Sequence, residues 1–157
     1  MNKIHKFNTD LQWQGNTGHG TTNYKAYKRN YTILAKNKPK IEGSADPVFL
    51  GDGTKYNPEE LFVASASACH MLWYLHLCAD AGVIVTHYDD NAEGIMVEKA
   101  NGSGKFTEII LHPVVIVKKK AMLKKALELH DKAGQMCFIA NSCNFPIGHK
   151  PVVKTAE

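Results

Sequence analysis

The chain is poor in arginine, since of its 19 basic residues only Arg29 is an arginine and the other 18 are lysines. No lysine or arginine stands between Lys55 and Lys99. The lysines are scattered, and the one dense run, 118–120 with 124–125, is typical of a solvated helix face. A formal net charge of +4 spread in this way does not indicate a nucleic-acid-binding surface.

Long hydrophobic runs and a secretion signal are also lacking. No 18 consecutive residues are apolar, which predicts no membrane span, and the first 15 residues have no apolar signal core. We therefore expect a cytoplasmic protein, in which the 4 cysteines are reduced. With 157 residues, 44% of them hydrophobic, the chain is predicted to form a single domain over 1–157.

The first third of the sequence predicts a small sheet. Polar and apolar residues alternate over 4–14 and 21–35, and the glycine-rich turn 15–20 between them predicts a β-hairpin. A third short strand is expected near Ile41. The segment 43–57 is rich in glycine, aspartate and proline, which predicts a loop.

A long apolar helix is predicted after that loop. Asn57 can cap it, Pro58 suits its first position, and Glu59 and Glu60 complement its dipole. Small and apolar residues continue to Gly82, which favours the end of a helix. Because the helix is apolar nearly all round, we expect it to be buried at the centre of the fold.

The remaining segments favour a second hairpin and a second helix. Residues 83–99 and 105–117 are rich in β-branched side chains and flank a turn at 101–104. An amphipathic helix is expected over 119–133, with a break at Gly134, and a last strand over 151–155. The order of elements predicts an α+β fold in which antiparallel sheets are wrapped around a long buried central helix.

The four cysteines do not form a metal-binding pattern. Cys137 and Cys143 are separated by five residues and no second close pair exists, so we expect no metal ion and no other cofactor. Cys78 lies nine residues after Cys69, which places it on the opposite face of the helix as a packing residue.

The segment from Asn57 to Cys69 resembles the signature of the OsmC/Ohr family of thiol peroxidases. The shared features are the Asn-Pro-Glu helix start, a run of small residues, and an Ala-Cys pair whose cysteine lies ten residues after Glu59. Cys137, after a helix that follows a β-hairpin, matches the second cysteine of the family, although Phe138 stands where relatives commonly have proline. The order of elements agrees over nearly the whole chain.

The resemblance implies an intertwined homodimer that reduces organic (alkyl or lipid) hydroperoxides through a two-cysteine cycle. Cys69 would be the peroxidatic cysteine and Cys137 the resolving one, with Cys143 as an alternative resolver. An external dithiol would reduce the resulting disulfide. The family also places an arginine and a glutamate beside the peroxidatic cysteine.

Distances along the helix constrain both of these residues. Cys69 lies twelve residues from Asn57, about 18 Å, so the helix dipole cannot stabilise its thiolate. The positive charge must come from another element, and the candidate is Arg29 on the predicted second strand. Glu59 and Cys69 are about 15 Å apart on different faces, so Glu59 can join a site only from a second subunit. This predicts a homodimer with active sites at the interface.

Two other functions stay open at this point. A non-enzymatic protein of the same fold could bind an apolar ligand in the dimer cleft, since Phe138 departs from the family pattern after Cys137 and no motif places Arg29 at the site. A cysteine hydrolase would need Cys69 to meet His130 or His149 in space. His70 and His130 are otherwise interpreted as packed histidines.

Overall fold

The computed structural model describes residues 2–156, and they divide into two compact units. These units comprise Met1–Leu61 and Phe62–Glu157, so the division falls in the first turns of the long helix α1 (Pro58–Asp80). Each unit is described by itself. The expected single domain stays a prediction.

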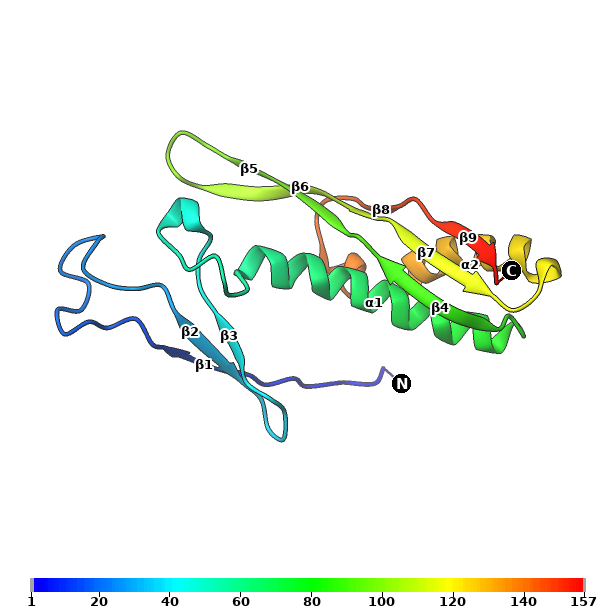
Figure 1. The fold of residues 1–157 in the computed structure, drawn as a ribbon, viewed down its shortest axis with the longest axis horizontal. Coiled ribbons are helices and arrows are strands. Elements are labelled where there is room, and N and C mark those ends of the chain that lie inside the picture. Colours follow the sequence, from blue (N-terminus) through cyan, green and yellow to red (C-terminus); the bar gives the residue numbers. More distant parts are fainter. Residues whose placement is uncertain (1, 157) are drawn as a thin grey trace. The chain divides into compact units, whose positions relative to one another are not determined.

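The first unit contains a three-stranded antiparallel sheet (Figure 1). Its strands are β1 (Asp10–Trp13), β2 (Tyr31–Leu34) and β3 (Ile41–Gly43), in the order β1-β2-β3. The predicted hairpin and the third strand near Ile41 are therefore confirmed, but the strands are shorter than expected.

The prediction that Arg29 lies on the second strand is wrong. β2 begins at Tyr31, and Arg29 lies in the preceding loop. Alternation favoured a strand from residue 21, but the Arg29 guanidinium donates to the backbone carbonyls of Tyr24 and Tyr27, which curls this segment into a compact loop. Side-chain bonding to nearby carbonyls competes here with strand pairing.

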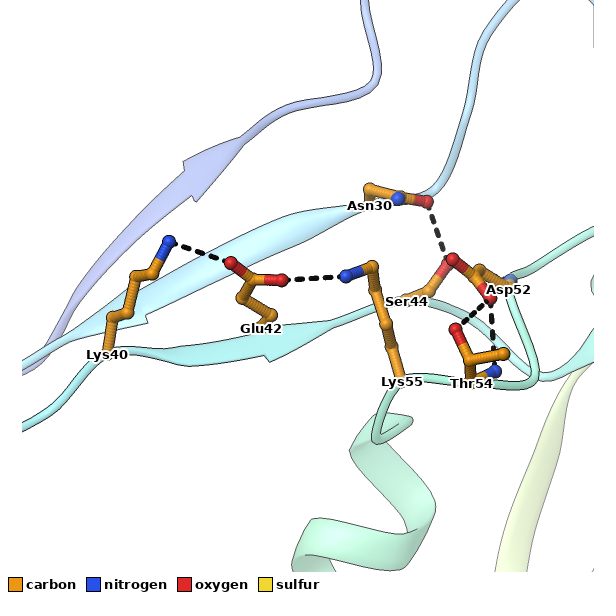
Figure 2. Close-up of polar contacts among 7 residues, drawn as sticks. All are labelled: Asn30, Lys40, Glu42, Ser44, Asp52, Thr54 and Lys55. Atoms are coloured by element: carbon orange, nitrogen blue, oxygen red, sulfur yellow. Dashed lines mark hydrogen bonds and ion pairs between the residues drawn. The ribbon is translucent and has the colours of Figure 1, made fainter.

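The predicted loop 43–57 is confirmed and contains one short helical turn, η1 (Pro47–Phe49). Figure 2 shows Glu42 of β3 between Lys40 and Lys55, each with its Nζ 2.7 Å from a Glu42 carboxylate oxygen. The Ser44 hydroxyl accepts a hydrogen bond from the Asp52 N–H at 3.0 Å. These contacts hold the end of the loop against β3 just before α1 begins.

Helix α1 begins as the sequence predicts. The Asn57 side-chain oxygen accepts from the Glu60 N–H at 2.7 Å, and the Asn57 N–H donates to the Glu60 carboxylate at 3.0 Å. This reciprocal pair is a capping box, which satisfies two amides at the helix start. After the helix, Gly82 has φ 70° and the Val83 N–H donates to the Cys78 carbonyl, which confirms the predicted C-terminal stop.

The second unit contains two long extended segments, and a short interruption divides each of them into two strands. The first is β4 (Val85–Asp90) followed by β5 (Glu93–Glu98), and the second is β6 (Gly104–Leu111) followed by β7 (Pro113–Val117). β5 pairs with β6 and β4 pairs with β7, both antiparallel, so the predicted hairpin is confirmed. The Asp90 carboxylate accepts the His112 N–H at 2.7 Å, which ties the two breaks together.

The all-antiparallel prediction is wrong for two strand pairs. The short turn η2 (Lys120–Met122) leads into α2 (Leu123–Met136) and then η3 (Ala140–Ser142), after which β8 (Ile147–His149) and β9 (Val152–Thr155) pair in parallel with β6 and β7 (Figure 1). Helix α2 carries the chain back as a crossover, and a crossover makes the strands that it joins parallel. The predicted break at Gly134 is also wrong, because α2 continues to Met136.

Within the described part of the chain, one stripe of α1 is buried, and the expected burial of its other faces at the centre of a homodimer stays a prediction. The stripe recurs every fourth residue and comprises Ala66, His70, Tyr74 and Cys78. Leu72 on another face is 63% exposed. The helix is long and apolar enough to cross a membrane, with a mean hydropathy of 1.3 over 18 residues, but core helices of soluble proteins pass the same test. The absence of a membrane span stays a prediction.

Candidate active site

The second unit brings Cys69 and Cys137 together. Cys69 lies on α1 and is half-buried, while Cys137 caps the C-terminus of α2 and is 1% exposed. Burial, and then hydrogen bonding with the Cys69 thiol, raises the pKa of Cys137 to about 11. The Ala140 N–H donates to the Cys137 sulfur at 3.4 Å and fixes its position. The predicted pair is therefore adjacent, with one accessible and one enclosed thiol.

The other two cysteines are kept away from this pair. The Cys143 thiol donates to the Ile139 carbonyl at 3.2 Å, whereas Cys137 accepts from Ala140. The Ile139 carbonyl and the Ala140 amide belong to one trans peptide group and point in opposite directions, so this peptide separates the two sulfurs. Cys78 is 1% exposed and packs in a hydrophobic core, as the sequence predicts.

A cavity of about 390 Å³ lies between α1 and the segment that follows Cys137. Phe62 and Ser65 of its wall share one face of α1 with Cys69, at positions i, i+3 and i+7. Its other wall belongs to the segment that follows Cys137. No lining residue carries a charge; they are Phe62, Ser65, Ile139, Ser142, Cys143, Asn144 and Phe145.

Two buried histidines join the helices that carry the thiols. His70 Nε2 lies 3.1 Å from His130 Nδ1, and the two residues are 2% and 0% exposed. The Tyr74 ring stacks on His130 with ring centroids 3.9 Å apart. Burial lowers the pKa of His70 to about 4 and that of His130 to about 3, so both rings are neutral at pH 7. Near the surface, His149 lies 3.0 Å from Asp131.

The arrangement expected of a cysteine hydrolase is not found. Within residues 2–156, no imidazole nitrogen is hydrogen-bonded to Cys69, and the ring nitrogens of His70 and His130 face each other instead. The part of the chain that the structure describes also holds no cluster of three or more potential metal ligands.

Arg29 is held by two tyrosines within the first unit. Its guanidinium carbon lies 4.2 Å from the ring centroids of both Tyr24 and Tyr27, which are cation–π contacts. Its terminal nitrogens donate to the carbonyls of the same tyrosines, and its Nε has no hydrogen-bond partner among residues 2–156. Glu59 lies half-buried in the first turn of α1, and Arg29 makes no ion pair with it in the described part of the first unit.

The sequence predicted the cysteine pair but not two side-chain clusters. These are the histidine pair with Tyr74 and the tyrosine clamp around Arg29. The spacing Tyr24-x-x-Tyr27-x-Arg29 is a usable signal for the tyrosine clamp, since it places two rings close to one guanidinium. His70 and Tyr74 are four residues apart, which places them on one helical stripe. Their partner across the helices, His130, can be found only from the packing.

Comparison with known proteins identifies the family. A family model described as "OsmC-like protein" matches residues 51–150. The chain belongs to the OsmC-like family. An OsmC-like protein of unknown function from Vibrio cholerae is 30% identical, with a TM-score of 0.85 over 95% of this chain and 100% of its own. Comparison with curated proteins found no match.

More distant solved structures share the fold of this OsmC-like chain. An organic hydroperoxide resistance protein from Elizabethkingia anophelis is 20% identical, with a TM-score of 0.70 over 99% of this chain and 100% of its own. An organic hydroperoxide resistance protein from Legionella pneumophila is 17% identical, with a TM-score of 0.66 over 98% and 100%. The resemblance read from the sequence is thereby confirmed at the level of the family.

The buried histidine pair predicts a stability that falls in mild acid. The pKa values of His70 and His130 are about 4 and about 3 in the folded chain, below the ordinary 6.5, so the unfolded chain binds protons more readily. Stability from the neutral pair is complete above pH 6.5 and is lost as the pH falls toward 4. Urea unfolding should show a loss on the order of 2 kcal/mol per imidazole between pH 7 and pH 5.

His130→Phe removes one titrating ring, so its loss between pH 7 and pH 5 should be smaller than that of the wild type. His76→Gln serves as the control, because the His76 side chain is 60% exposed and should leave the pH dependence unchanged. An equal unfolding free energy of the wild type at both pH values would contradict the prediction.

Proposed function

We propose that this OsmC-like chain is a thiol-dependent peroxidase that reduces organic hydroperoxides through Cys69 and Cys137. The observation that carries the proposal is the adjacency of these two thiols, one half-buried on α1 and one enclosed at the end of α2. The names of two structural relatives, organic hydroperoxide resistance proteins, agree with it. A reducing cytoplasm is the proposed setting.

The proposed cycle has three balanced steps. The Cys69 thiolate attacks one peroxide oxygen, the O–O bond breaks, and an alkoxide leaves and takes a proton to become the alcohol. The sulfur of Cys137 then attacks the Cys69 sulfenic acid, forming a disulfide while the hydroxyl group and the Cys137 proton leave as water. An external dithiol reduces the disulfide by thiol–disulfide exchange and is itself oxidised.

The different environments of the two sulfurs assign their roles. Cys137 remains a thiol at pH 7 because burial raises its pKa to about 11, and a protonated Cys137 can donate to a Cys69 thiolate. Cys69 is the more accessible sulfur and shares one face of α1 with Phe62 and Ser65, which line the uncharged cavity. The first attack is therefore assigned to Cys69, and the enclosed Cys137 acts only after oxidation has occurred beside it.

The cavity supports an organic rather than an inorganic peroxide. Phe62, Ile139 and Phe145 provide apolar surface for an alkyl group, while Ser65 and Asn144 offer hydrogen bonds near it. A volume of about 390 Å³ is within the range of small-molecule pockets. The same cavity favours the second candidate function, an apolar-ligand-binding protein, which would retain ligand during purification and have unreactive thiols.

Single-cysteine variants test the cycle. With one equivalent of cumene hydroperoxide, the wild type should form one Cys69–Cys137 disulfide, detected by mass spectrometry of the digested chain. Cys69→Ser should lose peroxide consumption by at least a hundredfold, because Cys137 is enclosed and the Cys143 thiol, although it lines the cavity, is bonded to the Ile139 carbonyl. Cys137→Ser should consume one equivalent and stop as a sulfenic acid.

Cys143→Ser is the matched control, since a peptide group separates Cys143 from Cys137. It should form the same disulfide as the wild type. Peroxide reduction by Cys69→Ser at the wild-type rate would refute the proposed function, and a Cys69–Cys143 bond in the wild type would reassign the resolving role.

Arg29 is the proposed source of positive charge for the Cys69 thiolate. It is the one side chain whose planar fork can contact a thiolate, a peroxide and a carboxylate together. The rings of Tyr24 and Tyr27 hold its guanidinium in one orientation, which lowers the entropy lost when it binds.

Replacing Arg29 should therefore make the Cys69 sulfur less reactive. We expect Arg29→Ala to slow peroxide reduction at pH 7 by about tenfold or more. The measurement is the rate of iodoacetamide alkylation of Cys69 at pH 7 alongside the peroxide assay, with Arg29→Lys as the control that keeps the charge without the fork. Identical rates in wild type and Arg29→Ala would exclude this role.

A homodimer with sites at its interface is the proposed assembly. Only 22% of the most apolar window of α1 is buried, and Ala64, Ala68 and Leu72 are exposed on one face. A second copy packed on this face would bury them. Because Glu59 and Cys69 lie about 15 Å apart along one helix, Glu59 of one subunit is proposed to serve Cys69 of the other.

Mixed dimers test whether Glu59 acts between subunits. Cys69→Ser and Glu59→Ala should each be inactive or nearly so alone, but refolding them together should restore about a quarter of the wild-type activity, because one site in each mixed dimer is complete. Light scattering should give the mass of two chains. Activity that is not restored in verified mixed dimers would place Glu59 within its own subunit or outside the site.

A further inference from the structure

The buried histidine pair joins the two helices that carry the thiols. His70 Nε2 lies 3.1 Å from His130 Nδ1, and this contact links the middle of α1 to α2 in addition to the hydrogen bond between Cys69 and the cap residue Cys137. His70 directly follows Cys69 on α1. His130 lies seven residues before Cys137, which places both on one stripe of α2.

His70 lies in the buried stripe of α1 and His130 in that of α2. The other residues of the α2 stripe are small. On α2, Ala126, His130, Ala133 and Cys137 are all 0–1% exposed. Apolar attraction is non-directional, whereas a buried polar contact can specify the register of two packed helices. A hydrogen bond between two rings, with Tyr74 stacked on one of them, fixes both the register and the rotation of α2.

We infer that His70 and His130 are positioning residues, which hold Cys137 at bonding distance from Cys69 for the step that forms the disulfide. Among residues 2–156, neither ring is hydrogen-bonded to Cys69 or Cys137. Their effect is transmitted by α2, which is continuous from His130 to its cap at Cys137, about 10 Å along the helix axis. The inference rests on the proposed function for its biological meaning, but thiol geometry can be measured without any peroxide.

The surroundings support a bond between neutral rings. His149 of β8 has its ring centroid 5.2 Å from that of His70 and 6.1 Å from that of His130, and it pairs with Asp131 on α2. Asp90 at the end of β4 is the remaining carboxylate that acts on His70. With both rings neutral, one donates and the other accepts, so a single proton links the helices.

Two amide substitutions of His130 distinguish a positioning role of its hydrogen bond from a role in packing alone. In His130→Asn the amide occupies the place of Nδ1, so it can bond His70. In His130→Gln the amide reaches the place of Nε2 and cannot. Both variants lose the stacking on Tyr74, and His76→Gln is the control for an exposed histidine of α1.

The experiment has two readouts on the full chain. Equilibration with reduced and oxidised glutathione gives the effective concentration of the Cys69–Cys137 pair. Rapid quench after cumene hydroperoxide, with dimedone to trap the sulfenic acid of Cys69, gives the rates of the first and second steps. Circular dichroism confirms that each variant is folded.

We expect the Gln variant to lower the effective concentration and the rate of disulfide formation at least tenfold, with dimedone adduct accumulating and the first step within twofold of wild type. The Asn variant and the control should remain within about threefold of wild type. Equal values for Asn and Gln, or wild-type values for Gln, would overturn the inference. Failure of all variants and the wild type to react with peroxide would refute the proposed function, while the glutathione values would still decide the positioning role.

Discussion

The site depends on the burial of one stripe of α1. Because Ala66, His70, Tyr74 and Cys78 recur every fourth residue, they face the same way and are covered by the second unit's sheets and α2. Cys69, one position before His70, is carried to the edge of the buried surface rather than into it. A thiol placed there is close to an enclosed partner and still reachable from outside.

The stripe is unusual in its chemistry. A helix that serves only as a core would present leucine or isoleucine at these positions, whereas α1 presents a histidine, a tyrosine and a cysteine. His130 Nε2, which has no hydrogen-bond partner among residues 2–156, shows that a polar group is kept here at a cost in stability. Such a cost is understandable where orientation between helices matters more than cohesion.

Local chemistry made much of the fold predictable. The cap formed by Asn57 and Glu60, the stop at Gly82 and the hairpin turn with Gly102 at φ 81° each depend on a few neighbouring residues, and each was confirmed. The parallel pairing of β8 and β9 depends on where α2 returns the chain, which no local pattern encodes. Cys69 and Cys137 could be singled out by spacing and family resemblance, whereas the loop position of Arg29 and the meeting of His70 with His130 arise only from folding.

The bond between the Ala140 amide and the Cys137 sulfur has a consequence for the cavity. Residues 139 and 142–145 form one wall of that cavity, and this wall is anchored to the sulfur at 3.4 Å. In the proposed cycle, a bond from Cys137 to Cys69 would take one sulfur lone pair and orient the Cys137 sulfur toward α1. The cavity wall would then be anchored differently in the reduced and the oxidised chain.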